Sequence, residues 1–296
     1  MTTLATRKHF LKALYQEAMD DDILNGAAVL GFYLMLAIFP AMIFVLAVIP
    51  YLPIANVEQA IMDLLRQALP ASAADMFTGV VKEVTQEQRG GLLSFGLLAA
   101  LWATSTGMYA IMQQLNITYG VSEGRGFLRA RLVAIALSLL FVVLVLGGFS
   151  LIVLGGQLQD WLGTRFDLGS ALLAFFTVFR WAIILAALLL AFSLIYYLAP
   201  NVKQRFRFLT AGSVAGVVVL LVASLAFAWY TQSIGNYAAT YGSVGAVIVL
   251  MLWLFIAGLA ILFGSEINVL IERRASGGKQ TAERVSGQRR HNAAAR

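Results

Sequence analysis

The sequence predicts an all-α polytopic membrane protein with six transmembrane helices, both termini in the cytoplasm and an external amphipathic helical hairpin between spans one and two. Three observations carry this prediction. Of the 296 residues, 60% are hydrophobic and only 12% are charged, whereas an ordinary soluble domain carries about 25% charged residues. Six apolar stretches are each long enough to cross a hydrocarbon core about 30 Å thick. Lysine and arginine are distributed unevenly among the connecting segments.

The chain is expected to divide into three parts. Residues 1–26 form a cytoplasmic interfacial helix, because their apolar residues repeat at helical spacing. Residues 27–271 form the six-helix transmembrane domain, and residues 272–296 form a basic, disordered cytoplasmic tail. The six spans are predicted at 27–52, 92–118, 132–155, 171–199, 209–231 and 243–267.

The external segment 54–90 lies between spans one and two. It contains "NVEQAIMDLLRQALPASAADMFTGVVKEVTQEQ", in which apolar residues repeat at helical spacing on both sides of Pro70. This pattern predicts two amphipathic helices on the outer face of the bundle. We expect them to cap the bundle, and a lid or a partner-docking surface is the alternative.

The basic residues predict the orientation. Sixteen of the 21 lysines and arginines lie in the N-terminal segment, the segments after spans two and four, and the tail, while four lie in the segments on the other side. Since basic residues gather in cytoplasmic loops, both termini are placed in the cytoplasm. The tail lacks interleaved aromatic residues, so we expect contact with membrane lipids and no specific nucleic-acid binding.

The sequence offers little for catalysis. There is no cysteine, and the two histidines, His9 and His291, lie in opposite tails. No Walker loop, serine elbow or HExxH motif is present. We therefore expect no enzymatic activity, no cofactor and no metal site. The consecutive acids Asp20, Asp21 and Asp22 could bind a divalent cation, but consecutive residues on a helix point in different directions, so we expect them to form a solvated break before the first span.

One basic residue, Arg180, lies deep in a predicted span, where a charge is costly and usually functional. Other helices place a proline, hydroxyls and an indole at a similar depth: Pro40, Thr104, Ser105, Thr106, Ser224 and Trp253. One hypothesis is that these residues line an outward-facing cavity in which Arg180 attracts a carboxylate, a phosphate or a lipid headgroup. The alternative is that Arg180 extends outward towards Asp160 or Asp167 and only fixes the bundle.

The apolar run of span six ends at Glu266 and Asn268. The predicted boundaries bring these two near the amides and arginines of neighbouring segments: Asn116, Asn201, Arg125, Arg129, Arg205 and Arg207. Glu266 is expected to pair with one of these arginines. The group would be a gate in a transporter and a latch in a static protein. Gly212 and Gly216 form a GxxxG motif, used within the chain or between copies in a homo-oligomer.

Several segments together resemble the YihY/BrkB family of bacterial inner-membrane proteins, formerly labelled ribonuclease BN. They are "AAVLGFYLMLAIFP" in span one, "LNITYG" followed by Arg125 and Arg129, "YYLAPN" at the end of span four, and "YGSVGAVIVLMLWLFIAGLAILFGSEIN" in span six. The resemblance covers about residues 20–272. It implies a multi-pass protein of the inner membrane, and it brings no agreed set of catalytic residues.

The resemblance leaves three functions open. We expect a transporter or exporter of a small anionic or amphipathic solute, with lipid as one candidate. The alternative is a non-transporting membrane scaffold in envelope assembly or virulence. A tRNA-processing ribonuclease ranks last, since the sequence shows no clustered metal ligands.

Overall fold

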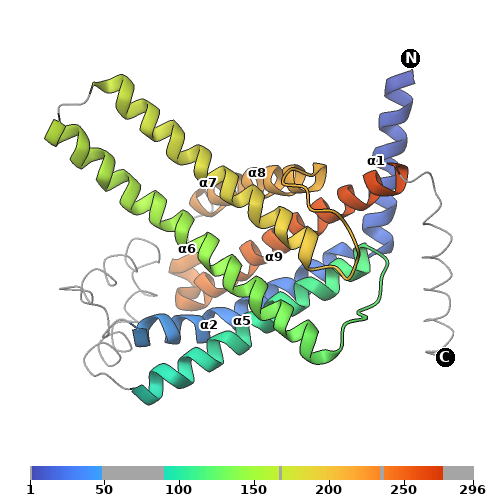
Figure 1. The fold of residues 1–296 in the computed structure, drawn as a ribbon, viewed down its shortest axis with the longest axis horizontal. Helices are drawn as coiled ribbons and strands as arrows, with labels where there is room; N and C mark the ends of the chain where they lie inside the picture. Colours follow the sequence, from blue (N-terminus) through green and yellow to red (C-terminus); the bar gives the residue numbers. More distant parts are fainter. Residues whose placement is uncertain (1, 49–89, 167–168, 234–236, 276–296) are drawn as a thin grey trace. The chain divides into compact units, whose positions relative to one another are not determined.

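The structure, a computed structural model, describes residues 2–48, 90–166, 169–233 and 237–275. Every regular element within these ranges is an α-helix (Figure 1). The helices are α1 (Thr2–Asp20), α2 (Ile23–Val48), α5 (Gly90–Thr118), α6 (Phe127–Phe166), α7 (Ser170–Leu198), α8 (Ala211–Ser233) and α9 (Tyr237–Ala275). For the described residues the predicted all-α class is therefore confirmed.

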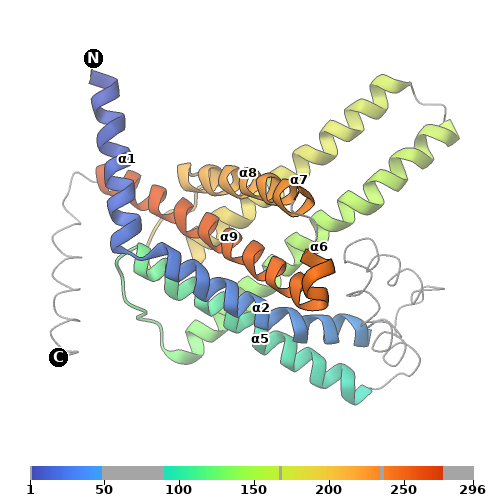
Figure 2. The same cartoon turned by 180° about the vertical axis from the view of Figure 1, so that it is seen from behind.

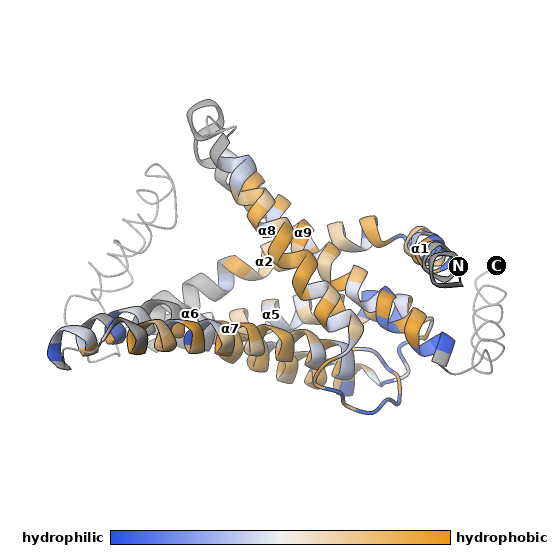
Figure 3. Ribbon diagram, turned by 90° about the horizontal axis from the view of Figure 1, so that it is seen from above, coloured by the Kyte–Doolittle hydropathy of each residue, from blue (hydrophilic) through white to orange (hydrophobic). Residues whose placement is uncertain are grey.

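Most of these helices suit a lipid environment. Five described helices are long and apolar enough to cross a membrane, or six if α1 and α2, separated by a short break, count as one interrupted span. Apolar residues run along them (Figure 3), and large ones such as Phe179, Leu225 and Trp229 are more than half exposed. A helix that is apolar on all sides is either buried in protein or set in a bilayer. The exposure of these side chains favours the bilayer.

Two helices extend well beyond their predicted spans. α6 has 40 residues and α9 has 39, so each measures close to 60 Å at about 1.5 Å per residue. The sequence marked only their apolar parts, 132–155 and 243–267, because helical hydrogen bonding continues where hydropathy falls. The predicted external hairpin (except Gly90) and the tail beyond Ala275 lie outside the described residues.

The chain forms two compact units, each assembled from separate stretches of sequence. The first contains α1, α6, α7, the end of α5 from Met112, the start of α8 up to Val218 and the end of α9 from Phe263. The second contains α2, α5 up to Ile111, α8 from Val219 and α9 up to Leu262.

In the first unit, α6 and α7 run side by side (Figures 1 and 2). The start of α8 packs on the end of α9 through glycines: a Cβ on Gly264 would lie 3.1 Å from the Gly216 Cα. The Gly212 amide donates to Asn268 Oδ1 at 2.7 Å. Small residues allow such close helix approach in membranes, so the GxxxG motif packs within the chain.

In the second unit, α2 lies along α5 (Figure 2) and also touches α9. A Cβ on Gly31 of α2 would lie 3.2 Å from the backbone nitrogen of Phe255, and a Cβ on Gly258 would lie 3.1 Å from the Ala27 carbonyl oxygen. Glycine at both crossing points thus brings the α2 and α9 backbones together.

Candidate functional site

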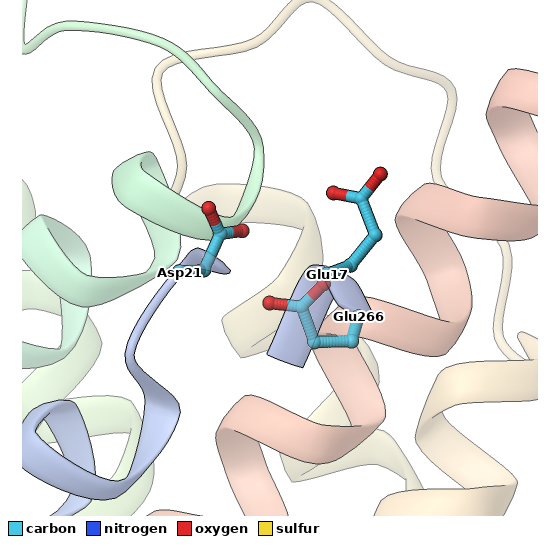
Figure 4. Close-up of side chains that lie close together, drawn as sticks. All are labelled: Glu17, Asp21 and Glu266. Atoms are coloured by element: carbon cyan, nitrogen blue, oxygen red, sulfur yellow. The ribbon is translucent and has the colours of Figure 1, made fainter. Parts of the chain in front are cut away.

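Three carboxylates from opposite ends of the chain meet in the first unit: Glu17, Asp21 and Glu266 (Figure 4). One carboxylate oxygen from each lies within 4.8 Å of the other two. The Asp21 amide donates to the Glu17 carbonyl at 2.8 Å, which continues the hydrogen-bond pattern of α1. Because residues four apart share a helix face, Glu17 and Asp21 point the same way, towards Glu266 on α9.

This carboxylate cluster, Glu17, Asp21 and Glu266, is short of compensating charge. Glu266 has no exposed surface, and neither of its carboxylate oxygens accepts a hydrogen bond from the described residues. Glu17 is paired with Arg273 on α9, and that pair is about three-quarters buried. Removing an ionised group from water without a partner is costly, so the cluster needs a further positive charge or protons.

A second polar group closes the end of α7. Arg125 donates from Nη2 to the Ala199 carbonyl at 2.7 Å and from Nη1 to the Leu198 carbonyl at 3.4 Å. Its Nε forms an ion pair with Glu123 Oε1 at 2.7 Å. A cation at the C-terminal end of a helix satisfies the last carbonyls and opposes the negative end of the helix dipole. Arg125 therefore caps α7.

Two asparagines extend this capping network, which we define as Asn116, Glu123, Arg125 and Asn201. The Asn201 amide donates to Asn116 Oδ1 at 2.7 Å, and Asn116 Nδ2 donates to Glu123 Oε2 at 3.1 Å. Burial alone would raise the pKa of Glu123, but the hydrogen bonds and charge of Arg125, with the Asn116 amide, lower that pKa below its usual value. Glu123 is thus an ionised anchor that joins α5 to the end of α7.

The third polar group surrounds Arg180 on α7. A Cβ on Gly155 of α6 would lie 2.8 Å from Arg180 Cδ, and one on Gly156 would lie 3.1 Å from Nη1. Nearby, Gln159 Nε2 donates to Thr177 Oγ1 at 2.8 Å and joins the two helices. Arg180 Nε and Nη1 are buried, and the described residues offer neither a hydrogen-bond acceptor. We call these five residues the Arg180 niche.

Comparison with known proteins identifies the family. Residues 14–288 match the family described as virulence factor BrkB, which is most of the chain. The chain belongs to the BrkB family. The resemblance noted in the sequence is therefore confirmed.

Relatives of this BrkB-family chain include the ribonuclease-like protein YfkH of Bacillus subtilis, 35% identical over 265 residues, which are 90% of this chain and 96% of the relative. A UPF0761 membrane protein of Alkalilimnicola ehrlichii is 27% identical over 83% of this chain, which spans 54% of that protein. The UPF0761 membrane protein VP0125 of Vibrio parahaemolyticus is 24% identical over 88% of this chain and 82% of its own length. No solved structure matches the chain. With the apolar helices, these relatives make the chain an integral membrane protein.

The residues predicted to line a cavity divide between the two units of the BrkB-family chain. Arg180 belongs to the first unit, and the other six candidates belong to the second. On α5, Thr104 donates to the Ala100 carbonyl, while Ser105 and Thr106 donate to the Trp102 carbonyl. Pro40 lies within α2, Ser224 on α8 and Trp253 on α9. A shared cavity therefore stays a prediction.

The predicted partners of Glu266 need correction. Arg125 pairs with Glu123, and Glu266 lies with Glu17 and Asp21. Asn116, Asn201 and Arg125 do come together, whereas Asn268 accepts from Gly212 instead. Arg129 and Arg205 are exposed. Arg125 caps the end of α7, and Asn116 links the Asn201 amide, which follows that end, to Glu123.

The expected solvated acidic break agrees with the exposed Asp20 and Asp22 at the break between α1 and α2 and needs correction only at Asp21. Asp21 is only partly exposed and belongs to the carboxylate cluster, while Asp22 accepts a hydrogen bond from Asn25 at 2.6 Å. Sequence reasoning missed Glu17, Asp21 and Glu123 as site residues. The spacing of four between Glu17 and Asp21 was a usable signal, because it places two carboxylates on one helix face. No local pattern joins them to Glu266, about 245 positions away.

Proposed function

We propose that this chain transports or exports a small anionic or amphipathic solute across a bacterial inner membrane, and that Arg180 receives the anionic group. One observation carries the proposal. The Arg180 guanidinium lies within a candidate span, and its Nε and Nη1 are buried without an acceptor among the described residues. Charged side chains inside a membrane commonly mark substrate pathways.

The chemistry of the guanidinium favours an external anion. Arginine stays protonated in proteins, and its planar fork matches a carboxylate or a phosphate through two parallel hydrogen bonds. Gly155 and Gly156 leave room for the Arg180 side chain, since a side chain at either position would clash with it. An anion bound along the Nε edge of the guanidinium would supply the acceptor that Nε lacks.

The surroundings of the niche favour an amphipathic anion. Leu158 on α6 and Phe179 on α7 are 56% and 54% exposed, and both flank the niche in sequence. A lipid-like solute would place its headgroup on Arg180 and its acyl chains along these apolar side chains, as the bilayer already does. An anionic phospholipid is the candidate that we favour.

The orientation completes the proposal. From the distribution of basic residues we place six spans in the inner membrane, with both termini in the cytoplasm. The capping network then lies on the cytoplasmic side and acts as a static latch, because its hydrogen bonds hold helix ends. We further propose that the chain is not an enzyme. The words "ribonuclease-like" in the name of YfkH describe that protein.

The test is lipid movement in proteoliposomes that contain the purified full-length chain. A fluorescent phosphatidylglycerol should cross the bilayer faster with the protein than without it. Arg180→Gln should slow this movement by about tenfold or more, because a hydrogen bond to a charged group is worth about 1.5–3 kcal/mol. Arg165→Gln, which removes an exposed arginine from the last turn of α6, is the matched control and should leave the rate unchanged.

Two results would contradict the proposal. One is a folded, correctly inserted Arg180→Gln protein that moves the anionic lipid as fast as the wild type. The other is wild-type protein that moves neither the lipid nor a soluble organic anion. The second result would favour a scaffold in envelope assembly, in which Arg180 only fixes the bundle.

A further inference from the structure

We infer that Glu17, Asp21 and Glu266 bind a hard divalent cation, Ca²⁺ or Mg²⁺, which joins the end of α1 to α9. This site lies in the first unit and is separate from the Arg180 niche. It does not depend on the transport proposal, because its role is to hold two helices together. Three observations support it: the spacing of the carboxylates, the burial of Glu266 and the charge balance.

The spacing suits one shared ion. Hard cations take carboxylate oxygens at about 2.0–2.6 Å, so oxygens on one ion lie at most roughly 4–5 Å apart. One oxygen from each of the three residues lies within 4.8 Å of the other two. The ligand types also fit, since Ca²⁺ and Mg²⁺ prefer oxygen donors. The other ligands would be waters, which can reach the exposed 29% of the Glu17 side chain.

The state of Glu266 points independently to a missing partner. Its side chain is fully buried, and Figure 4 shows its carboxylate directed towards Asp21. Neither of its oxygens has a donor within the described part of the chain, and the same holds for Asp21 Oδ2. Acceptor oxygens of three carboxylates turned towards one another repel unless a positive charge lies between them. A cation supplies that charge.

The charge balance fits a divalent ion. The three carboxylates carry a formal charge of −3, and Arg273, paired with Glu17 Oε1, reduces the total to −2. One divalent cation neutralises this remainder. Arg273 occupies one oxygen of Glu17 and leaves the other for the ion. Protonation of two carboxyls would also neutralise the cluster, and the experiment separates the two cases.

The experiment titrates Mn²⁺ into the full-length chain, purified in a neutral detergent and treated with a chelator. Free Mn²⁺ is followed by electron paramagnetic resonance, and Ca²⁺ and Mg²⁺ are added as competitors. We expect one Mn²⁺ bound per chain, displaced by Ca²⁺ or Mg²⁺. Cation binding should also raise the midpoint of thermal unfolding, because a ligand that binds only the folded state stabilises it.

Two variants test the assignment. Glu266→Gln keeps the shape of the side chain and removes its charge, and it should weaken Mn²⁺ binding by at least about tenfold, since even indirect partners of a metal change affinity by that much. Asp21→Asn should weaken Mn²⁺ binding to a similar extent. This second variant tests the assignment if Glu266→Gln does not fold. Asp22→Asn is the matched control: it removes the adjacent carboxylate, which is held by Asn25, and should bind Mn²⁺ as the wild type does.

Three results would overturn the inference of a cation site. Wild-type protein that binds no Mn²⁺ at neutral pH would show that protons neutralise the cluster. Equal loss of binding in Asp22→Asn and Asp21→Asn would show that Mn²⁺ collects on surface charge. Unchanged binding in folded Asp21→Asn or Glu266→Gln would place the ion elsewhere.

Discussion

Glu123, in the segment after α5, and Glu266, within α9, show how two carboxylates can have opposite surroundings. Glu123 accepts hydrogen bonds from Arg125 and Asn116, whereas Glu266 faces two further acids. The first environment stabilises the ionised form, and the second raises the free energy of a negative charge. The consequence is that Glu123 stabilises the fold by itself, while Glu266 needs a partner.

The surroundings of Glu123 lead to a prediction about pH. Its folded-state pKa lies below the ordinary value of 4.5, so its contribution to stability is complete above about pH 5.5 and is lost as the pH falls through the folded pKa. At pH 7, Glu123→Gln should therefore lower the free energy of unfolding by about 1–3 kcal/mol.

The measurement is thermal unfolding of wild type and Glu123→Gln in detergent, between pH 7 and pH 4. The difference in midpoint should be constant down to about pH 5.5 and shrink below it. Arg129→Gln, an exposed change in the same segment, serves as the control without a pH effect. A difference that grows as the pH falls would contradict the assignment.

The sequence predicted which polar residues lie near helix ends better than it predicted which of them form ion pairs. It placed Asn116, Asn201 and Arg125 near one another, as the structure does, because Asn116 lies in the last turn of one apolar run and the other two follow the ends of such runs. It gave Glu266 an arginine partner because opposite charges on adjacent loops usually pair. Which charges meet depends on helix rotation and on how far α9 continues past its apolar part, and neither follows from local pattern.

At the scale of elements, α8 meets α9 through glycine. A Cβ on Gly212 would overlap the Gly264 carbonyl oxygen and the side chain of Asn268. The Gly264 backbone cannot move to relieve this clash, whereas the end of a flexible side chain could. The GxxxG motif was visible in the sequence as a site of close approach, but only the structure identifies Gly264 as its counterpart.

The contact predicts a large effect of one methyl group. Gly212→Ala should lower the free energy of unfolding by about 1–3 kcal/mol or more, as overpacking does. Gly147→Ala is the matched control, since Gly147 lies in α6 and a Cβ there meets nothing within 4 Å. That change should be neutral or stabilising by up to about 1 kcal/mol, because alanine is the better helix former.

The measurement compares the thermal stability of the variants. Each detergent-solubilised variant is heated, and the monodisperse fraction that survives is measured by size-exclusion chromatography. The expected order of midpoints is Gly147→Ala at or above wild type, with Gly212→Ala clearly below both. Equal midpoints for the two variants would mean that α8 and α9 are not in close contact at Gly212.

Helices were the most predictable elements. Five predicted spans overlap the helices that are long and apolar enough to cross a membrane, α5 to α9, and the described part of the first span, 27–48, lies in α2. A run of about twenty apolar residues has few alternatives in a bilayer. Their ends were less predictable. α6 continues to Phe166, past Gln157, Gln159 and Arg165, since polar residues do not end a helix whose backbone bonds remain satisfied.

At the scale of the whole molecule, the chain is an integral membrane protein with a bilayer around its apolar helices. Apolar composition, helix length and relatives described as membrane proteins agree on this. The chain folds as two discontinuous units, which hydropathy alone does not reveal, because the division cuts across α5, α8 and α9. Function at this scale depends on which side of the membrane each end occupies.

The central claim is that six spans leave both ends of the chain in the cytoplasm, which fixes the sides on which the Arg180 niche and the carboxylate cluster face. Reporter fusions in a bacterial host test it most directly. A green fluorescent protein fused after Arg296 should fluoresce, and alkaline phosphatase at the same position should be inactive. Alkaline phosphatase fused after Phe166 should be active. Active phosphatase after Arg296, with a dark fluorescent fusion there, would contradict the claim.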